Sequence, residues 1–190
     1  MRLILLLLAV AAIGGCDRQK AEVQQGNEVA AAPDLPSKGV DRSHKGKAGP
    51  AATFKDPDGG DISLADFKGT PVLVNLWATW CAPCVKELPT YDRLAQSHAI
   101  DGELGVIAVS QDNGPANSVK AFLAKLGIKD LGAYQDPAMA LAGGLQADIL
   151  PTTILFDKDG REVWRYVGDL DWTGPEAAKL LAEANGGGAG

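Results

Sequence analysis

Two cysteines separated by two residues are the part of this chain best suited to chemistry. Cys81 and Cys84 enclose Ala82 and Pro83, and they follow an apolar run at residues 71–76. That run is short and rich in β-branched residues, so it predicts a buried strand that ends just before a helix begins. The unpaired N–H groups and positive dipole end of a helix start stabilise a thiolate. We therefore predict a reversible dithiol/disulfide pair.

The two thiols are expected to have different roles. Cys81, at the start of the helix, is predicted to be the nucleophile, because in such motifs the thiol pKa falls to about 3.5–7.5 from about 8.5. Cys84, one turn inside, is expected to be more buried and to resolve the mixed disulfide that Cys81 forms with a substrate. A permanent structural disulfide is the alternative. It is disfavoured because closing so small a loop stabilises a fold little.

The residues around this pair resemble a known family. Residues 74–84 read VNLWATWCAPC, Glu87 follows the second cysteine by three residues, and residues 150–153 read LPTT. These motifs resemble the membrane-tethered, thioredoxin-like reductases of the TlpA/ResA group. The stretch GDLDW at 168–172, followed by an expected helix, is similar to the TlpA branch. The likeness covers residues 52 to 184.

This resemblance implies both a fold and an activity. The fold is α/β and thioredoxin-like, with a central mixed β-sheet flanked by helices and an N-terminal β-hairpin. The activity is that of a thiol:disulfide oxidoreductase, which reduces protein disulfides and needs no cofactor beyond the Cys81–Cys84 disulfide. The intervening Ala82 and Pro83 exclude the histidine that helps make some relatives oxidising, so we expect a reductase.

The resemblance also assigns roles to residues outside the cysteine pair. Glu87 stands where the group carries a glutamate that transfers protons and tunes the cysteine pKa values, whereas Asn75 replaces the buried aspartate of cytosolic thioredoxins. A solvated helix glutamate is the alternative for Glu87, because carboxylates are rarely buried. Pro151 is expected to be cis and to face the cysteines. The predicted substrate-binding residues are Trp80, Ala82, Pro83, Leu150 and Pro151, while Trp77 is assigned to the core.

The N-terminus has the pattern of an export signal. Arg2 precedes an apolar segment at residues 3–13, two glycines and Cys16. The segment is shorter than the roughly 20 residues of a transmembrane helix. Residues 13–16 resemble a bacterial lipobox, which predicts cleavage before Cys16 and lipidation of that cysteine. We therefore expect a lipid anchor on the periplasmic face of the inner membrane. A plain secretory signal, which would give a soluble periplasmic protein, is the alternative.

Export has consequences for partners. A CxxC pair in an oxidising compartment stays reduced only when electrons are supplied, so an integral membrane electron donor of the DsbD/CcdA kind is expected. The other expected partners are proteins whose disulfides are reduced, either apocytochrome c or copper-site proteins, and the TlpA likeness favours the copper sites. Binding or delivery of copper by the reduced thiolates is an alternative function, although no metal site is predicted. A net charge of −6 without a basic cluster argues against nucleic acid.

Composition divides the chain into a leader, a linker and one domain. Its 190 residues, 46% of them hydrophobic, suit a single domain. Residues 1–15 are the predicted signal, and residues 16–51, with His44 among them, contain few large apolar side chains and predict a flexible tether. Residues 52–185 form the predicted domain, and 186–190 a disordered tail. We expect a hairpin at 54–64, strands at 71–76, 103–110, 131–134, 153–156 and 162–167, and helices at 84–98, 115–126, 137–142 and 173–184, the last with Thr173 as N-cap.

Overall fold

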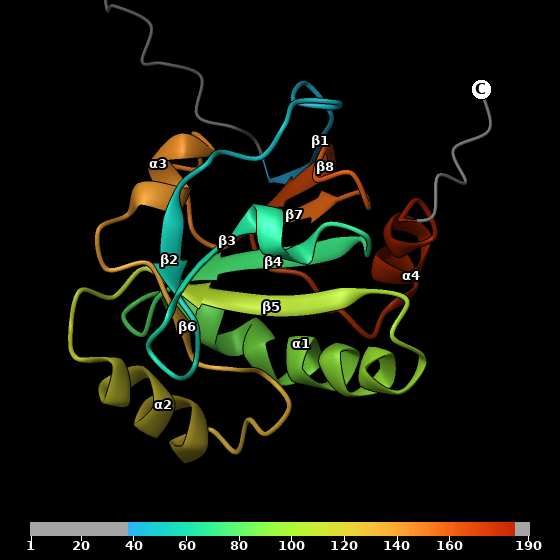
Figure 1. Cartoon of the computed structure of the whole chain (residues 1–190). Helices are drawn as coiled ribbons and strands as arrows, with labels where there is room; N and C mark the ends of the chain where they lie inside the picture. The colour runs from blue at the N-terminus through green and yellow to red at the C-terminus, as the bar shows by residue number, and fades with distance from the viewer. Residues whose placement is uncertain (1–37, 185–190) are drawn as a thin grey trace, which may run out of the picture. The chain divides into compact units, whose positions relative to one another are not determined.

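An eight-stranded mixed sheet runs through the computed structural model, which describes residues 38–184 apart from the side chains at 99–101 and 116 (Figure 1). The strand order is β1-β8-β7-β4-β5-β6-β2-β3. Only the pairs β4/β5 and β5/β6 are parallel among the described strands. The strands are β1 (Gly39–Asp41), β2 (Thr53–Lys55), β3 (Asp61–Ser63), β4 (Val72–Trp77), β5 (Gly105–Ser110), β6 (Tyr134–Gln135), β7 (Thr152–Phe156) and β8 (Glu162–Val167).

Helices cover both faces of this sheet, as the sequence predicts. They are the 3₁₀ helix η1 (Leu64–Phe67) and the α-helices α1 (Ala82–Asp101), α2 (Ala116–Lys125), α3 (Ala140–Gly144) and α4 (Pro175–Leu181). The central strand β4 is buried throughout and alternates between two cores. Leu73 and Trp77 pack with α1, α2 and α4, whereas Val74 and Leu76 pack with α3 and η1. Each fully buried large apolar side chain stabilises the fold by about 1.5–3 kcal/mol.

Helix α1 carries the cysteine motif and has clear start and stop signals. Cys81 is its N-cap, and Pro83 lies in the first turn, where a missing N–H leaves no hydrogen bond unmade. The helix continues past Pro89 and ends at Gly102, whose φ of 66° is the left-handed conformation that glycine adopts without strain. The β2–β3 hairpin also forms where the sequence predicts it.

The folded part of the chain begins earlier than predicted. Residues 38–51 were expected to be tether, but β1 pairs with β8, and Gly46 donates a backbone hydrogen bond of 2.7 Å to the carbonyl of Glu162. His44, expected to be a solvated linker residue, lies with its Nδ1 3.0 Å from a guanidinium nitrogen of Arg165. Backbone pairing and polar contacts hold this segment. The prediction of a tether is wrong here because it rests on the lack of large apolar residues, which these contacts do not need. The predicted signal, Cys16 and the tail at 186–190 lie outside the described residues.

Smaller differences concern the ends of elements. Thr173 is not the N-cap of α4: its hydroxyl donates to Asp171 at 2.6 Å, and Gly174 caps a helix that starts at Pro175. Helix α3 begins three residues later than predicted, because the buried carboxylate of Asp136 accepts the N–H groups of residues 140–142. Strand β6 likewise lies at the end of the predicted range rather than across it.

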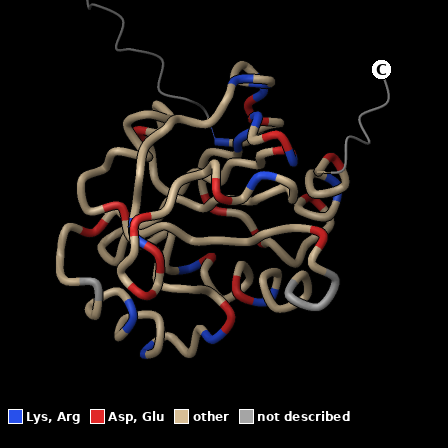
Figure 2. Tube along the Cα trace, viewed as in Figure 1, with Lys and Arg blue, Asp and Glu red and all other residues tan. Residues whose placement is uncertain are grey.

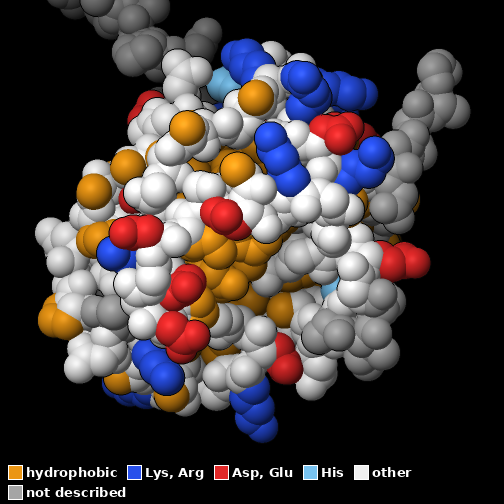
Figure 3. Space-filling view, viewed as in Figure 1, with side chains coloured by type: hydrophobic (Ala, Val, Ile, Leu, Met, Phe, Trp, Pro, Cys, Tyr) orange, Lys and Arg blue, Asp and Glu red, His pale blue; other side chains and the backbone are white. Residues whose placement is uncertain are grey.

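The described surface mixes charges of both signs. Figure 2 shows lysine and arginine interspersed with aspartate and glutamate along the trace. Figure 3 shows hydrophobic side chains gathered near the middle of the viewed face, where β4 and β5 run in Figure 1, with acidic side chains beside them. Within residues 38–184, no helix has the length and apolar character needed to cross a bilayer.

Candidate functional site

The sheet brings the predicted site residues to one edge. Strands β4 and β5 are parallel, and their last residues, Trp77 and Ser110, are paired. Strand β7 runs antiparallel to β4 and begins with Thr152 opposite Leu76. The cysteine motif leaves this edge after β4, and Pro151 enters it just before β7. Residues that are about 70 positions apart in the sequence therefore meet at the carboxyl ends of the parallel strands.

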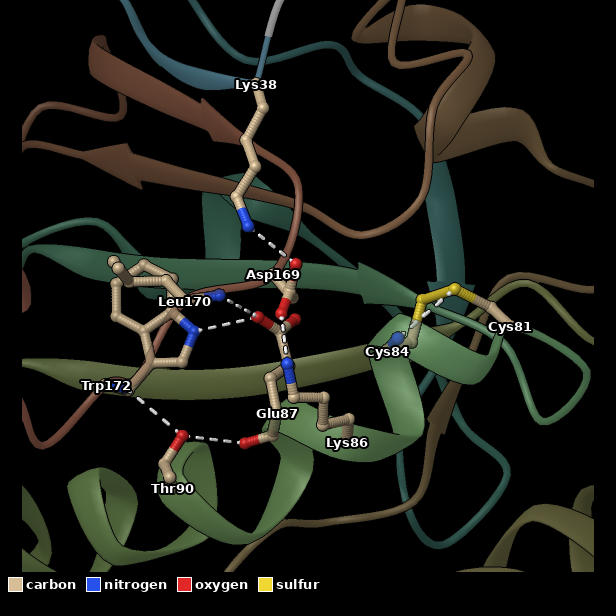
Figure 4. Close-up of polar contacts among 9 residues, drawn as sticks. All are labelled: Lys38, Cys81, Cys84, Lys86, Glu87, Thr90, Asp169, Leu170 and Trp172. Atoms are coloured by element: carbon tan, nitrogen blue, oxygen red, sulfur yellow. Dashed lines mark hydrogen bonds and ion pairs between the residues drawn. A yellow bond between two sulfur atoms is a disulfide. The ribbon is translucent and has the colours of Figure 1, made fainter.

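Cys81 and Cys84 form a disulfide at the start of α1, with their Cα atoms 5.3 Å apart (Figure 4). The Cys84 N–H points at the Cys81 sulfur, 3.3 Å away. Cys81 is 6% exposed and Cys84 is fully buried, which is the order that the sequence predicts. When the disulfide is reduced, this N–H and the helix dipole favour the thiolate of Cys81.

The predicted substrate-binding residues surround this pair at different depths. Trp80 is 70% exposed, and Ala82 and Pro83 are exposed beside it. Leu150 is half-buried, and the peptide bond between it and the buried Pro151 is cis, as expected. A protein partner can therefore reach Trp80 and the first turn of α1 directly. Contact of these five residues with a substrate stays a prediction.

Trp77, by contrast, belongs to the core, as predicted. Its side chain is fully buried, and its ring lies 6.1 Å from that of Phe122 on α2. The two tryptophans on either side of the turn before α1 thus have opposite environments.

Glu87 is buried, not solvated. Only 3% of it is exposed. Its Oε1 accepts a hydrogen bond of 2.7 Å from the Asn75 amide, and its Oε2 accepts 3.0 Å and 3.2 Å bonds from the Leu170 N–H and the Trp172 indole. Figure 4 shows the carboxyl turned toward the segment that carries Leu170 and Trp172. The Asn75 amide also donates to Thr153 on β7, which fixes its orientation.

These surroundings have opposing effects on the ionisation of Glu87. Burial raises its pKa from the usual 4.5 to about 7, because a charged carboxylate loses hydration in the interior. The three hydrogen-bond donors lower the pKa, and the negative charge of Asp169 raises it further. Burial has the largest effect. Glu87 therefore changes its protonation near neutral pH, in the range where thiols of CxxC motifs also titrate.

Sequence reasoning missed Asp112, which supports the loop in front of Cys81. Its carboxylate accepts hydrogen bonds from the Thr79 N–H at 3.0 Å, the Thr79 hydroxyl at 2.7 Å and the Ser110 hydroxyl at 2.6 Å. Asp112 thereby ties the end of β5 to the turn that carries the cysteine motif. Its place directly after a predicted inner strand, at the carboxyl edge of the sheet, was the signal that could have revealed it.

Copper binding by the reduced thiolates is the alternative function that the sequence leaves open. Among residues 38–184, no cluster of three or more histidine, cysteine, aspartate or glutamate side chains is placed to hold a metal ion.

Comparison with known proteins identifies the family. The Redoxin family model matches residues 44–181. The chain belongs to the Redoxin family. It is 36% identical, over 124 residues, to the thiol-disulfide oxidoreductase ResA of Bacillus thuringiensis strain Al Hakam, a match that covers 65% of this chain and 70% of ResA. The chain is therefore an oxidoreductase of the ResA/TlpA thioredoxin-like type, in agreement with the paired cysteines of its site.

Solved structures agree with the fold. A DsbF homologue from Corynebacterium diphtheriae superposes with a TM-score of 0.60 at 23% identity, covering 80% of this chain and 95% of that one. The exposed lipoprotein thioredoxin Etrx1 of Streptococcus pneumoniae superposes with a TM-score of 0.56 at 26% identity, covering 69% and 96%. The predicted thioredoxin-like architecture is therefore correct.

Proposed function

We propose that this protein reduces disulfides of other proteins outside the cytoplasm by cycling Cys81 and Cys84 between dithiol and disulfide. The observation that carries this proposal is the placement of the pair: a sulfur at the N-terminus of a helix, beside the 70% exposed Trp80. A permanent staple would not need an exposed aromatic surface next to it. The buried Glu87, with a pKa of about 7, adds a proton acceptor on the same helix.

The cycle transfers two electrons to the substrate. The Cys81 thiolate attacks one sulfur of a substrate disulfide, forms a mixed disulfide and expels the other substrate sulfur, which takes up a proton. Cys84 then loses its proton, attacks the Cys81 sulfur and expels the second substrate thiol. The products are a reduced substrate and the Cys81–Cys84 disulfide. A dithiol of an integral membrane electron donor, of the DsbD/CcdA kind, returns two electrons and two protons by the same exchange in reverse.

The direction of the reaction follows from the residues between the cysteines and from the compartment. Ala82 and Pro83 place no histidine beside Cys81, so the thiolate lacks the extra stabilisation that makes some relatives oxidising. Outside the cytoplasm, a pair of low potential transfers electrons to substrate disulfides.

The proposed location is the periplasmic face of the inner membrane. The support is the export pattern of residues 1–15 and the lipobox-like sequence ending at Cys16. The similar Etrx1 is itself an exposed lipoprotein. The proposed substrates are cysteine pairs of copper sites or of apocytochrome c, in agreement with the motifs shared with the TlpA/ResA group.

The decisive experiment is the reduction potential of Cys81–Cys84 in the full-length protein, measured by equilibration with dithiol buffers. We expect a value near the roughly −270 mV of thioredoxin. A value near the roughly −120 mV of a strong oxidant would overturn the reductase proposal. Cys81→Ser should abolish turnover, and retained turnover would remove the cycle. Cys16→Ser is the matched control, because it removes a cysteine outside the site: it should keep the potential and lose membrane association.

Substrates can be separated with a trapping variant. In Cys84→Ser, the Cys81 thiolate can still attack a substrate disulfide, but no second thiol is present to release the substrate. Mixed disulfides therefore accumulate. We would offer it an oxidised copper-site peptide and an oxidised apocytochrome c peptide at equal concentration. We expect the copper-site peptide to be trapped faster. Faster trapping of the cytochrome peptide would mean that apocytochrome c, and not a copper-site protein, is the preferred substrate.

A further inference from the structure

Residues 168–172, here called the 168–172 loop, lie between β8 and α4 and cover Glu87. Two of the three donors to the Glu87 carboxylate come from this loop, the Leu170 N–H and the Trp172 indole. The Trp172 N–H also bonds to the hydroxyl of Thr90 on α1 at 3.2 Å. The surroundings of Glu87 therefore depend on where this loop lies.

Asp169 anchors the loop through two lysines from distant parts of the chain. Its Oδ1 lies 2.7 Å from the Lys38 ammonium, and its Oδ2 lies 3.1 Å from the Lys86 ammonium (Figure 4). Lys38 precedes β1, and Lys86 lies on α1 next to Glu87. The hydrogen bonds from Lys38 and Lys86 lower the pKa of Asp169 to about 2, so its side chain, 26% exposed, stays charged. One carboxylate thus joins the N-terminal segment, α1 and the loop.

A cavity of about 220 Å³ lies beside this bridge. Its lining includes Glu87, Lys86 and Asp169, and it gives the otherwise buried carboxyl a route to solvent. A cavity of this size with polar walls can hold several water molecules. A proton that leaves Glu87 through the cavity passes the ionic bridge.

We propose that Asp169 is a positioning residue: the Lys38–Asp169–Lys86 bridge keeps the 168–172 loop on Glu87 and controls how this carboxyl exchanges its proton with solvent. The proposal rests on the proposed function: Glu87 follows Cys84 on α1 by one turn, and we infer that it takes the proton that the Cys84 thiol loses when this sulfur attacks Cys81. The proton then moves from Glu87 to water in the cavity, so that proton transfer balances without a further reactant.

The charged and titratable groups around Glu87 determine the sign of the effect. Tyr91 on α1, Asp169 in the loop and Tyr166 on β8 interact electrostatically with Glu87. Lys86 lines the same cavity as Glu87, and both Lys86 and Lys38 are paired with Asp169. Both tyrosines have a raised pKa and are neutral near pH 7, because burial disfavours their charged form. Replacing Asp169 by a neutral residue removes the one anion of this set.

Loss of that anion favours the charged form of Glu87 in two ways. The negative charge of Asp169, which raises the pKa of Glu87, is removed, and a loosened loop admits water to the carboxyl. Both changes lower the pKa of Glu87. Loss of the Leu170 hydrogen bond acts in the opposite direction but has a smaller effect than burial, which is the main cause of the raised value.

The test is a titration of Glu87 in the full-length oxidised protein, followed by carbon NMR of labelled glutamate carboxyl groups. Glu87→Gln identifies the resonance. Asp169→Asn should lower the pKa of Glu87 by about one unit. Asp171→Asn is the matched control: it removes the same charge from the same loop, but its carboxylate bonds to Thr173 and not to a lysine. Asp169→Glu should restore most of the wild-type value. Equal titration of Glu87 in wild type and Asp169→Asn would overturn the proposal.

A second measurement needs no variant. The lysine partners are exposed, so 1 M salt should screen the bridge and move the wild-type Glu87 titration toward lower pH. No shift between low and high salt would contradict the role of the bridge even if Asp169→Asn does not fold. Because these titrations use the disulfide form, they can fail independently of the proposed function, which falls if Cys81→Ser retains turnover or if the potential lies near that of a strong oxidant, roughly −120 mV.

Discussion

Two glutamates of this protein are buried to the same extent but have opposite partners. Glu87 and Glu162 are each 3% exposed. Glu162 is held by a guanidinium: the Arg165 Nε and Nη2 each donate to one of its oxygens at 2.7 Å. Among the described residues, the hydrogen-bond donors to Glu87 are all neutral, namely an amide, a backbone N–H and an indole.

The difference separates a structural carboxylate from one that can react. The bidentate pair fixes Glu162, and Arg165 also donates to the Leu145 carbonyl at 3.0 Å and contacts His44, so it ties β8 to the end of α3 and to the N-terminal segment. Neutral donors orient Glu87 without giving it a countercharge. Its pKa is therefore raised to about 7 by burial, and it can gain or lose a proton at neutral pH.

The largest expected effect comes from breaking the ion pair. Arg165→Met leaves the Glu162 carboxylate buried without a cation, which should destabilise the fold by about 3–5 kcal/mol. Urea unfolding at neutral pH measures it. The double variant Glu162→Gln/Arg165→Met removes both charges and should recover much of the loss. If Arg165→Met is as stable as wild type, the Glu162–Arg165 ion pair does not hold the N-terminal segment.

Glu87 should instead show its effect in the pH dependence of stability. An unfolded chain releases the Glu87 proton near pH 4.5 and the folded protein near pH 7, so the folded state binds the extra proton between these values. The contribution of Glu87 to stability is therefore complete below this window and falls by about 3 kcal/mol as pH rises through it, at about 1.4 kcal/mol per unit.

Glu87→Gln removes this dependence while keeping an acceptor for Leu170 and Trp172. We expect the variant to gain stability relative to wild type between pH 5 and pH 8, measured by urea unfolding at both values. Parallel curves for wild type and variant would show that Glu87 does not titrate in this range.

The comparison also explains what the sequence could reveal. Cys81, Cys84 and Glu87 lie within seven residues, so a strand-to-helix signal and a motif were enough to place them. Two of the donors to Glu87, Leu170 and Trp172, are more than 80 residues away, and Lys38 is 131 residues from Asp169. Tertiary packing, and no local pattern, brings them together. The sequence predicts a tether at residues 38–51 for the same reason, because the contacts of this segment with Glu162 and Arg165 are long-range and polar.

The smallest expected effect is a shift in the pKa of Glu87 when the indole of Trp172, one of its hydrogen-bond donors, is removed. A comparison with Trp164 distinguishes the loss of this donor from a loss of packing. Trp172 and Trp164 are both buried, and each indole makes one hydrogen bond of 3.2 Å, to the Glu87 carboxylate and to the Leu180 carbonyl respectively. Replacing either by phenylalanine should cost a similar stability of about 1–3 kcal/mol. Only Trp172→Phe removes a bond that favours charged Glu87, so only it should raise the pKa of Glu87, by less than about one unit. Equal shifts in the carboxyl titrations of the two variants would mean that packing around Glu87, and not its donors, controls its proton.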